Sequence, residues 1–106
     1  MSAPDRSIIF SREAENDLEA IGRYGYETWG EAQVNRYNAR ILEMLQSLLI
    51  FPRMGAVHGD LAPQVRSIGV GHHRILYRVE AARIIVVRIL HERMDEPPEP
   101  RPDEDH

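Results

Sequence analysis

The residues best suited to acid–base chemistry lie near the end of the chain, where His91 follows a run of aliphatic residues. Four arginines could join it around one phosphate group: Arg66, Arg78, Arg88 and Arg93. Neighbouring positive charge weakens an imidazole's hold on its proton, which suits a general base. Such a set could cleave RNA through the RNA's own 2′-hydroxyl, with arginines on the charged transition state. The alternative is that His91 ends a strand and hydrogen-bonds to backbone.

Other catalytic chemistries lack the residues they need. The sequence has no cysteine, which excludes thiol nucleophiles, disulfides and zinc ribbons. It contains no glycine-rich phosphate loop and no metal-ligand spacing, so we expect neither a cofactor nor a metal. All 13 basic residues are arginine, which excludes lysine bases and Schiff-base chemistry. His72 and His73 are adjacent on a predicted turn, and we expect their side chains to diverge.

Length and charge predict a single domain with a tail. The 106 residues suffice for one domain and are too few for two. Residues 1–93 carry 12 arginines and 11 acidic residues, whereas residues 94–106 carry one arginine and six acidic residues. The second segment alternates acids with proline, so we predict a domain over 1–93 and a disordered or extended tail over 94–106. No apolar run reaches the ~20 residues of a membrane span, and no signal pattern opens the chain, which indicates a cytoplasmic protein.

Hydrophobic periodicity predicts the elements that must position these side chains. Ser11 is a candidate helix cap, and helical spacing of apolar residues continues from there to about Thr28. A second amphipathic helix is expected over Glu31–Leu49, ended by Phe51-Pro52, with Trp29 buried at the helix–helix junction. Residues 53–64 are predicted to be a loop. Four strands are expected, over Ser7–Phe10, Val65–Val70, His73–Val79 and Arg83–Leu90. The order β-α-α-β-β-β predicts an α+β fold of two layers, with an antiparallel helix hairpin packed on an antiparallel sheet.

Turn lengths predict which residues share a face of the sheet. A two-residue turn at Gly71-His72 and a three-residue turn at 80–82 put one apolar set against the helices: Ile68, Val70, Ile75, Tyr77, Val79, Ile85, Val87 and Ile89. Arg66 lies at the margin of that set. The opposite face is then aliphatic with arginines among the aliphatic side chains: Ser67, Arg74, Leu76, Arg78, Ile84, Val86, Arg88 and Leu90.

This second face places Arg74 opposite Arg88, a like-charge pair that destabilises an isolated sheet. A partner that brings acidic and apolar groups would satisfy both kinds of residue. The alternative is that the arginine stems lie over the aliphatic side chains with their charged ends in water. The first interpretation predicts a partner-binding surface that comprises Arg74, Leu76, Arg78, Val86, Arg88 and Arg93.

Short patterns from residue 14 to residue 95 resemble a known family. They are Ala14-x-x-Asp17-Leu18-x-x-Ile21, Tyr26-x-x-Trp29-Gly30 followed by Tyr37, Leu48-x-x-x-Pro52-x-x-Gly55, Val65-Arg66-Ser67-Ile68, Tyr77-Arg78-Val79, and Val87-Arg88-Ile89-Leu90-His91-x-Arg93-x-Asp95. In this order and spacing the chain resembles toxins of the RelE/ParE superfamily, and in particular the ParE branch. The family fold is the β-α-α-β-β-β arrangement already predicted.

The resemblance implies a toxin of a type II toxin–antitoxin module. ParE-type toxins are associated with inhibition of DNA gyrase, and each is neutralised by a small ParD-like antitoxin of the ribbon-helix-helix class. It therefore implies gyrase as target, a toxin–antitoxin hetero-oligomer, no membrane partner and no catalytic residues. RelE-type toxins are instead ribosome-dependent mRNA endoribonucleases, and that alternative would rest on Arg66 and His91. The absence of lysine favours the ParE branch. A third hypothesis is a non-toxic member that only binds a partner.

Overall fold

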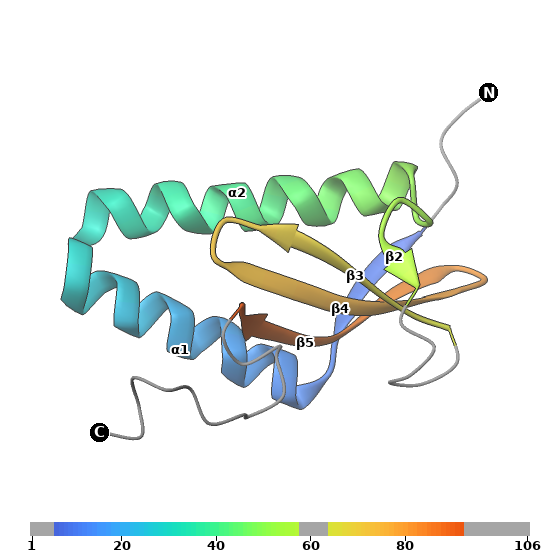
Figure 1. The fold of residues 1–106 in the computed structure, drawn as a ribbon, viewed down its shortest axis with the longest axis horizontal. Helices are drawn as coiled ribbons and strands as arrows, with labels where there is room; N and C mark the ends of the chain where they lie inside the picture. Colours follow the sequence, from blue (N-terminus) through green and yellow to red (C-terminus); the bar gives the residue numbers. More distant parts are fainter. Residues whose placement is uncertain (1–5, 58–63, 93–106) are drawn as a thin grey trace, which may run out of the picture.

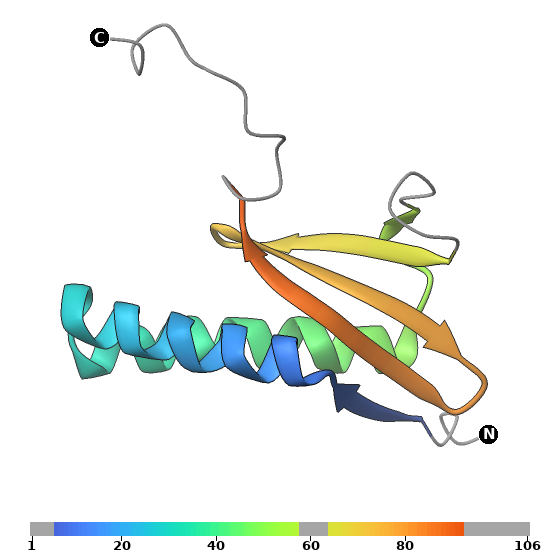
Figure 2. The same cartoon turned by 90° about the horizontal axis from the view of Figure 1, so that it is seen from below.

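The computed structural model describes residues 6–57 and 64–92. The elements follow the chain as β1 (Ser7–Phe10), α1 (Arg12–Trp29), α2 (Glu31–Ile50), β2 (Ala56–Val57), β3 (Val65–Val70), β4 (His73–Glu80) and β5 (Arg83–His91). Both helices pack on one face of the sheet, and none of the described residues forms a helix on its other face (Figures 1 and 2). This confirms the predicted two-layer α+β fold. The predicted tail over 94–106 and Arg93 lie outside the described residues.

The sheet is mixed, with the strand order β1-β5-β4-β3-β2. β1 runs parallel to β5, whereas the other neighbouring pairs are antiparallel. The prediction of a wholly antiparallel sheet is therefore wrong at this edge. The helix hairpin returns the chain to the side where β1 begins, so β3 runs in the same direction as β1, and so does β5 after two antiparallel turns. The segment predicted as a loop over 53–64 also contributes the two-residue edge strand β2.

Local signals account for both helices. The Ser11 side chain accepts the backbone N–H of Ala14 at 3.0 Å, as expected of an N-cap. Gly30 separates the helices with φ of 91°, a conformation that side-chain-bearing residues rarely adopt. Its N–H donates to Tyr26 O and its carbonyl accepts from Val34 N, so one residue serves both helix ends. Neither helix in the described part of the chain is long and apolar enough to cross a membrane.

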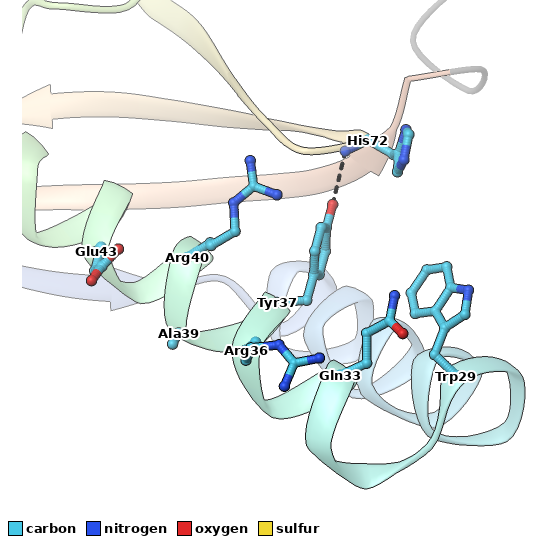
Figure 3. A pocket seen from close by; sticks show the side chains of 8 residues that line it. All are labelled: Trp29, Gln33, Arg36, Tyr37, Ala39, Arg40, Glu43 and His72. Atoms are coloured by element: carbon cyan, nitrogen blue, oxygen red, sulfur yellow. Dashed lines mark hydrogen bonds between the residues drawn. The ribbon is translucent and has the colours of Figure 1, made fainter.

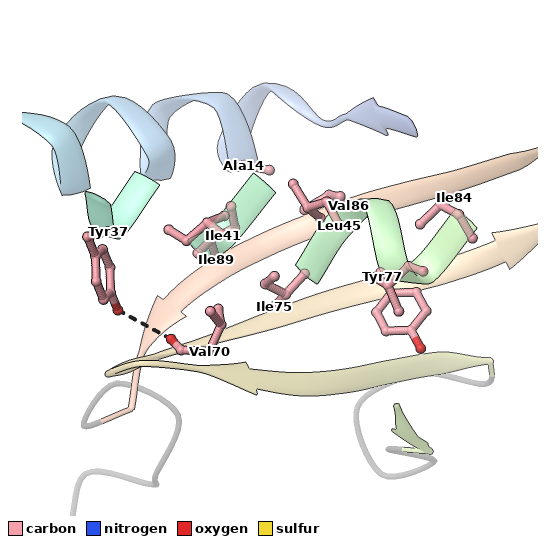
Figure 4. Packing of buried hydrophobic residues seen from close by; sticks show 11 residues of the cluster. Ala14, Tyr37, Ile41, Leu45, Val70, Ile75, Tyr77, Ile84, Val86 and Ile89 are labelled. Atoms are coloured by element: carbon pink, nitrogen blue, oxygen red, sulfur yellow. Dashed lines mark hydrogen bonds between the residues drawn. The ribbon is translucent and has the colours of Figure 1, made fainter. Parts of the chain in front are cut away.

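The core lies between the helices and the sheet (Figure 4). The amphipathic character predicted for the second helix is confirmed, since α2 buries one set of residues against the sheet: Val34, Tyr37, Ile41, Leu45 and Leu48. In the described part of the chain, the sheet adds six residues to this core: Val70, Ile75, Tyr77, Ile84, Val86 and Ile89. The paired register of Val70 with His73 and of Ile68 with Ile75 is also as predicted.

The predicted register of β4 against β5 is wrong. The turn is shorter than predicted, with Glu80 opposite Arg83. Tyr77 then lies opposite Val86 while Leu76 lies opposite Arg88, so Val87 is an extra residue, as in a β-bulge. A one-residue shift exchanges the faces of a strand. Ile84 and Val86 are therefore fully buried in the core in place of Ile85 and Val87.

The shorter turn and the bulge together remove the predicted like-charge pair. Arg74 lies opposite Leu90 rather than Arg88.

Trp29 also departs from prediction, because 40% of its surface is exposed and it does not close the end of the core. Its ring lies 5.9 Å from that of Tyr24 and 6.3 Å from that of Tyr37. The close approach of the helices is made by Gly25 instead, where an added Cβ would lie 2.7 Å from Cγ2 of Val34.

Tyr77 fixes the connection between α2 and the sheet from inside the core. Its side chain is fully buried, and its hydroxyl donates to Pro52 O at 2.8 Å. The same oxygen accepts the backbone N–H of Gly55 at 2.9 Å. Gly55 must be a glycine here, because a Cβ would lie 2.7 Å from both Ser67 O and the Tyr77 hydroxyl.

Tyr77→Phe should lower the free energy of unfolding by about 1–3 kcal/mol, because a buried N–H and a carbonyl lose their partner. Chemical denaturation of the variant and of the wild type measures this difference. Tyr26→Phe is the matched control, since Tyr26 is 60% exposed and should change the free energy by less than about 0.5 kcal/mol. Equal stability of both variants would show that the Tyr77 hydroxyl does not hold the connection.

Candidate functional site

The face of the sheet without helices carries two of the predicted partner-binding arginines. Arg74 and Arg78 project from β4 on either side of Leu76, whose side chain is 7% exposed. Arg74 donates to the Ser67 hydroxyl at 3.3 Å. Arg78 lies 3.6 Å from the Glu80 carboxylate, and its Nε is buried and has no hydrogen-bond partner among the described residues. Leu90 and Ile85 lie opposite these arginines on β5 and are half-buried, so this open face combines aliphatic surface with positive charge, but Ile84 and Val86 of the predicted set lie in the core.

Two other predicted members of that surface have different roles. Val86 is fully buried in the core, which removes it from any exposed surface. Arg88 forms a bidentate pair with Asp17 of α1, through Nε at 2.7 Å and a terminal nitrogen at 2.9 Å. The Asp17 carboxylate also accepts the backbone N–H of Ile89 at 2.9 Å. Burial works to raise the pKa of Asp17, but the hydrogen bonds from Arg88 and Ile89 and the charge of Arg88 outweigh it, so the pKa is lowered.

Arg66 and His91, the predicted nuclease pair, lie at opposite ends of the sheet. Arg66 is opposite Tyr77 at the start of β3, and its guanidinium donates to Gly55 O at 2.8 Å and to Arg53 O at 3.3 Å. His91 is opposite His73, at the start of β4. Four residues of extended strand separate Tyr77 from His73, or about 13 Å. The structure does not bring the two side chains together.

Three histidines gather where the β3–β4 turn meets the end of β5. The ring centroid of His91 lies 5.3 Å from that of His73 and 6.4 Å from that of His72, with the His72 ring nearly parallel. His72 and His73 thus both flank His91, which the expectation of diverging side chains did not foresee. In the described part of the chain, no three histidine or acidic side chains are placed to hold a metal ion.

Tyr37 connects this histidine cluster to α2. Its hydroxyl lies 2.6 Å from Nδ1 of His73, accepts the backbone N–H of His72 at 2.9 Å, and donates to Val70 O at 3.2 Å. Gly71 makes the approach possible, because its φ is 59° and an added Cβ would lie 2.6 Å from the Tyr37 hydroxyl. The β3–β4 turn therefore packs against the Tyr37 side chain of α2.

Two hollows adjoin the cluster and share Trp29 and His72. The histidine pocket, of about 340 Å³, is lined by Asp17, Ala20, Ile21, Tyr24, Trp29, His72, His73, Ile89 and His91. The arginine hollow, of about 830 Å³, is lined by Trp29, Gln33, Arg36, Tyr37, Ala39, Arg40, Glu43 and His72 (Figure 3). Figure 3 shows Arg36 and Arg40 one turn apart on α2, on the same side as the Tyr37 ring.

Sequence reasoning missed most of this region. The signal that was available is the spacing of Asp17, Ile21 and Tyr24, which places all three on one face of α1. The convergence of His73 with His91 depends on the bulge at Val87, which no turn signal in the sequence marks.

Histidine ionisation should reduce the stability of the fold. Burial lowers the pKa of His73, and the charges of His91 and His72 lower it further, against the opposing effect of Glu92 and Asp17. An unfolded chain binds this proton at a pKa of about 6.5. The stability that neutral His73 contributes is therefore present above about pH 6.5 and is lost as pH falls through the lower folded value.

We expect the wild type to lose unfolding free energy between about pH 7.5 and pH 5. His73→Gln, which keeps a hydrogen-bonding group beside Tyr37, should lose measurably less over that interval. Denaturation curves at matched ionic strength measure both profiles. Parallel profiles in the two proteins would contradict a protonation effect at His73.

Comparison with known proteins gives a family to this arrangement. The family description "ParE toxin of type II toxin-antitoxin system, parDE" matches residues 8–96. The chain is 33% identical over 88 residues to toxin ParE1 of Mycobacterium tuberculosis, which covers 82% of this chain and 90% of the relative. It is 38% identical over 90 residues to toxin ParE of Escherichia coli, with coverage of 84% and 87%.

Solved structures agree on the fold. A chain of the chromosomal ParDE toxin–antitoxin system from P. aeruginosa superposes with a TM-score of 0.70 at 24% identity, covering 82% of this chain and 96% of that one. A chain of the toxin–antitoxin complex RelBE2 from Mycobacterium tuberculosis gives a TM-score of 0.60 at 23% identity, with coverage of 82% and 98%. Helix hairpin, mixed sheet and nearly the whole described sequence thus have counterparts in one group of proteins, and the chain belongs to the ParE family of toxins of type II toxin–antitoxin systems.

Proposed function

We propose that this toxin inhibits DNA gyrase through protein–protein contact and is neutralised by a ParD-like ribbon-helix-helix antitoxin in a hetero-oligomeric complex. The observation that carries the proposal is the separation of Arg66 from His91. A nuclease needs a base and cations around one phosphate. Here Arg66 is bonded to the backbone carbonyls of Gly55 and Arg53, and His91 lies among other histidines. A toxin that acts by binding needs only a surface, and a cytoplasmic location follows from its proposed target.

The open face supports the antitoxin part of the proposal. Arg74 and Arg78 offer charge beside the half-buried Leu90 and Ile85, which lie opposite them on β5. An antitoxin segment that folds on binding can bring carboxylates to the arginines and an apolar side to these two residues. Relative to the surface predicted from sequence, this interface keeps Arg74, Leu76 and Arg78. It omits Val86, which is in the core, and Arg88, which is paired with Asp17.

Purified toxin should inhibit supercoiling by gyrase, and addition of the antitoxin should restore it. Programmed ribosomes treated with the same toxin should keep their mRNA intact. His91→Gln should remain toxic in a growth assay, because a binding toxin needs no base at that position. Loss of toxicity in a folded, antitoxin-binding His91→Gln variant would favour the ribonuclease alternative, for which removal of a base costs about 10²–10⁴ in rate. A wild type without toxicity would favour the third hypothesis, a module that only binds a partner.

Arg78→Glu should weaken antitoxin binding by about 2–5 kcal/mol if its charge pairs become buried in the complex. Isothermal calorimetry measures the affinity. Arg12→Glu is the control, since Arg12 is exposed at the start of α1, away from the open face. If Arg78→Glu and Arg74→Glu both bind like the control, the open face is not part of the antitoxin interface.

A further inference from the structure

The end of the helix hairpin carries a second surface, separate from the open face. The histidine pocket and the arginine hollow meet there, because Trp29 and His72 line both. Trp29 is 40% exposed and Tyr24 is 62% exposed, although their rings are in edge contact. Exposed tryptophan, tyrosine and arginine beside a hollow are the residue types that contribute most energy to protein interfaces.

The two hollows differ in character. The walls of the histidine pocket are mainly apolar or aromatic, with Ala20, Ile21 and Ile89 between the rings. Its one carboxylate, that of Asp17, is engaged by Arg88 and by the Ile89 N–H. A large apolar side chain fits such a pocket better than a charged group does.

The arginine hollow is cationic. Arg36 and Arg40 lie one helical turn apart, where like charges destabilise a helix by a few tenths of a kcal/mol. Neither guanidinium forms an ion pair with a residue in the described part of the chain, and Glu43 is the one carboxylate in the lining. Arg40 lies over the Tyr37 ring, 5.9 Å from its centroid, which holds its charge at the hollow. Carboxylates of a partner would complement this pair.

We propose that one acidic, amphipathic segment of the antitoxin spans both hollows, with an apolar side chain in the histidine pocket and carboxylates at Arg36 and Arg40, and that acidification weakens this contact. The inference rests on the proposed antitoxin partner and adds a second, pH-sensitive contact to the one on the open face. The shared residues Trp29 and His72 lie at the junction that the segment crosses.

The direction of the pH effect follows from what surrounds His73. Tyr37 faces it from α2, His72 from the turn, His91 from β5, Glu92 from just beyond β5, and Asp17 from α1. A proton on His73 is opposed by burial and by the other two histidines, and an apolar side chain that covers the pocket removes still more water. Protonation and binding therefore compete. Partner carboxylates with ordinary pKa values near 4 stay ionised above pH 5.5, so they do not produce the change.

The first arm of the test blocks the pocket. Ala20 is an exposed residue of α1 that lines the histidine pocket, so Ala20→Trp fills the pocket without disturbing the core. Ala32→Trp is the matched control, since Ala32 is exposed on α2 and lines neither hollow. Calorimetry with the purified, full-length ParD-like antitoxin of the proposed function should show at least tenfold weaker binding for Ala20→Trp at pH 7.5 and unchanged binding for Ala32→Trp.

The second arm measures how the affinity for the antitoxin changes with pH. Wild-type affinity should fall severalfold between pH 7.5 and pH 5.5, and by less than about tenfold, because the pKa of His73 lies below the ordinary value of about 6.5. His73→Gln should remove most of that change. A melting curve of each variant at each pH verifies that the toxin is folded.

The outcomes separate this inference from the proposed function. Tight binding by Ala20→Trp, or a wild-type affinity that does not change with pH, would overturn the inference while the antitoxin remains the partner. Failure of the wild type to bind the antitoxin at pH 7.5 would overturn both. A wild type that binds the antitoxin but leaves gyrase active would overturn only the proposed target.

Discussion

The outer edge of β5 is the constraint on which the rest of the structure depends. β1 covers this edge only from Arg83 to Val86. Beyond that point the start of α1 takes over, since Ser11 N–H donates to Val86 O at 3.0 Å and its hydroxyl to Val87 O at 2.7 Å. Asp17 then accepts the Ile89 N–H. One strand and one helix thus supply hydrogen-bond partners for an edge that would otherwise be open to another chain.

The β-bulge at Val87 and the ion pair of Arg88 with Asp17 follow from this change of hydrogen-bond partner, from β1 to the start of α1. Val87 is the extra residue of β5, and it lies next to the point where β1 ends and Ser11 begins to bond the strand. Beyond the bulge, Ile89 returns to the core and Arg88 reaches Asp17. The charge of Arg88 is thereby used to hold α1 on the sheet, while Arg74 and Arg78 project from the neighbouring strand. Three arginines with similar sequence surroundings therefore have two different roles.

The helices and strands could be predicted from local chemistry, whereas which strands pair, and in which register, could not. Ser11, Gly30 and Pro52 mark element ends through capping, backbone freedom and steric exclusion, and the structure has helix ends there. The parallel contact of β1 and the bulge at Val87 are long-range choices, decided by which edge groups α1 can satisfy. The exposure of Trp29 likewise depends on Gly25, which lets the helices approach so closely that Val34 fills the junction.

The same distinction explains why the candidate site was only partly predictable. Leu76 and the arginines of β4 follow from strand alternation alone, so the open face could be predicted from sequence. The surface formed by the histidine pocket and the arginine hollow requires Tyr37 to contact the β3–β4 turn. That contact exists because Gly71 leaves room for the tyrosine ring. Arg66, read from sequence as a group for chemistry, is instead bonded to the backbone carbonyls that follow α2. In this chain the polar groups nearest the core, among them Asp17, Arg66 and Arg88, hold the elements of the fold together.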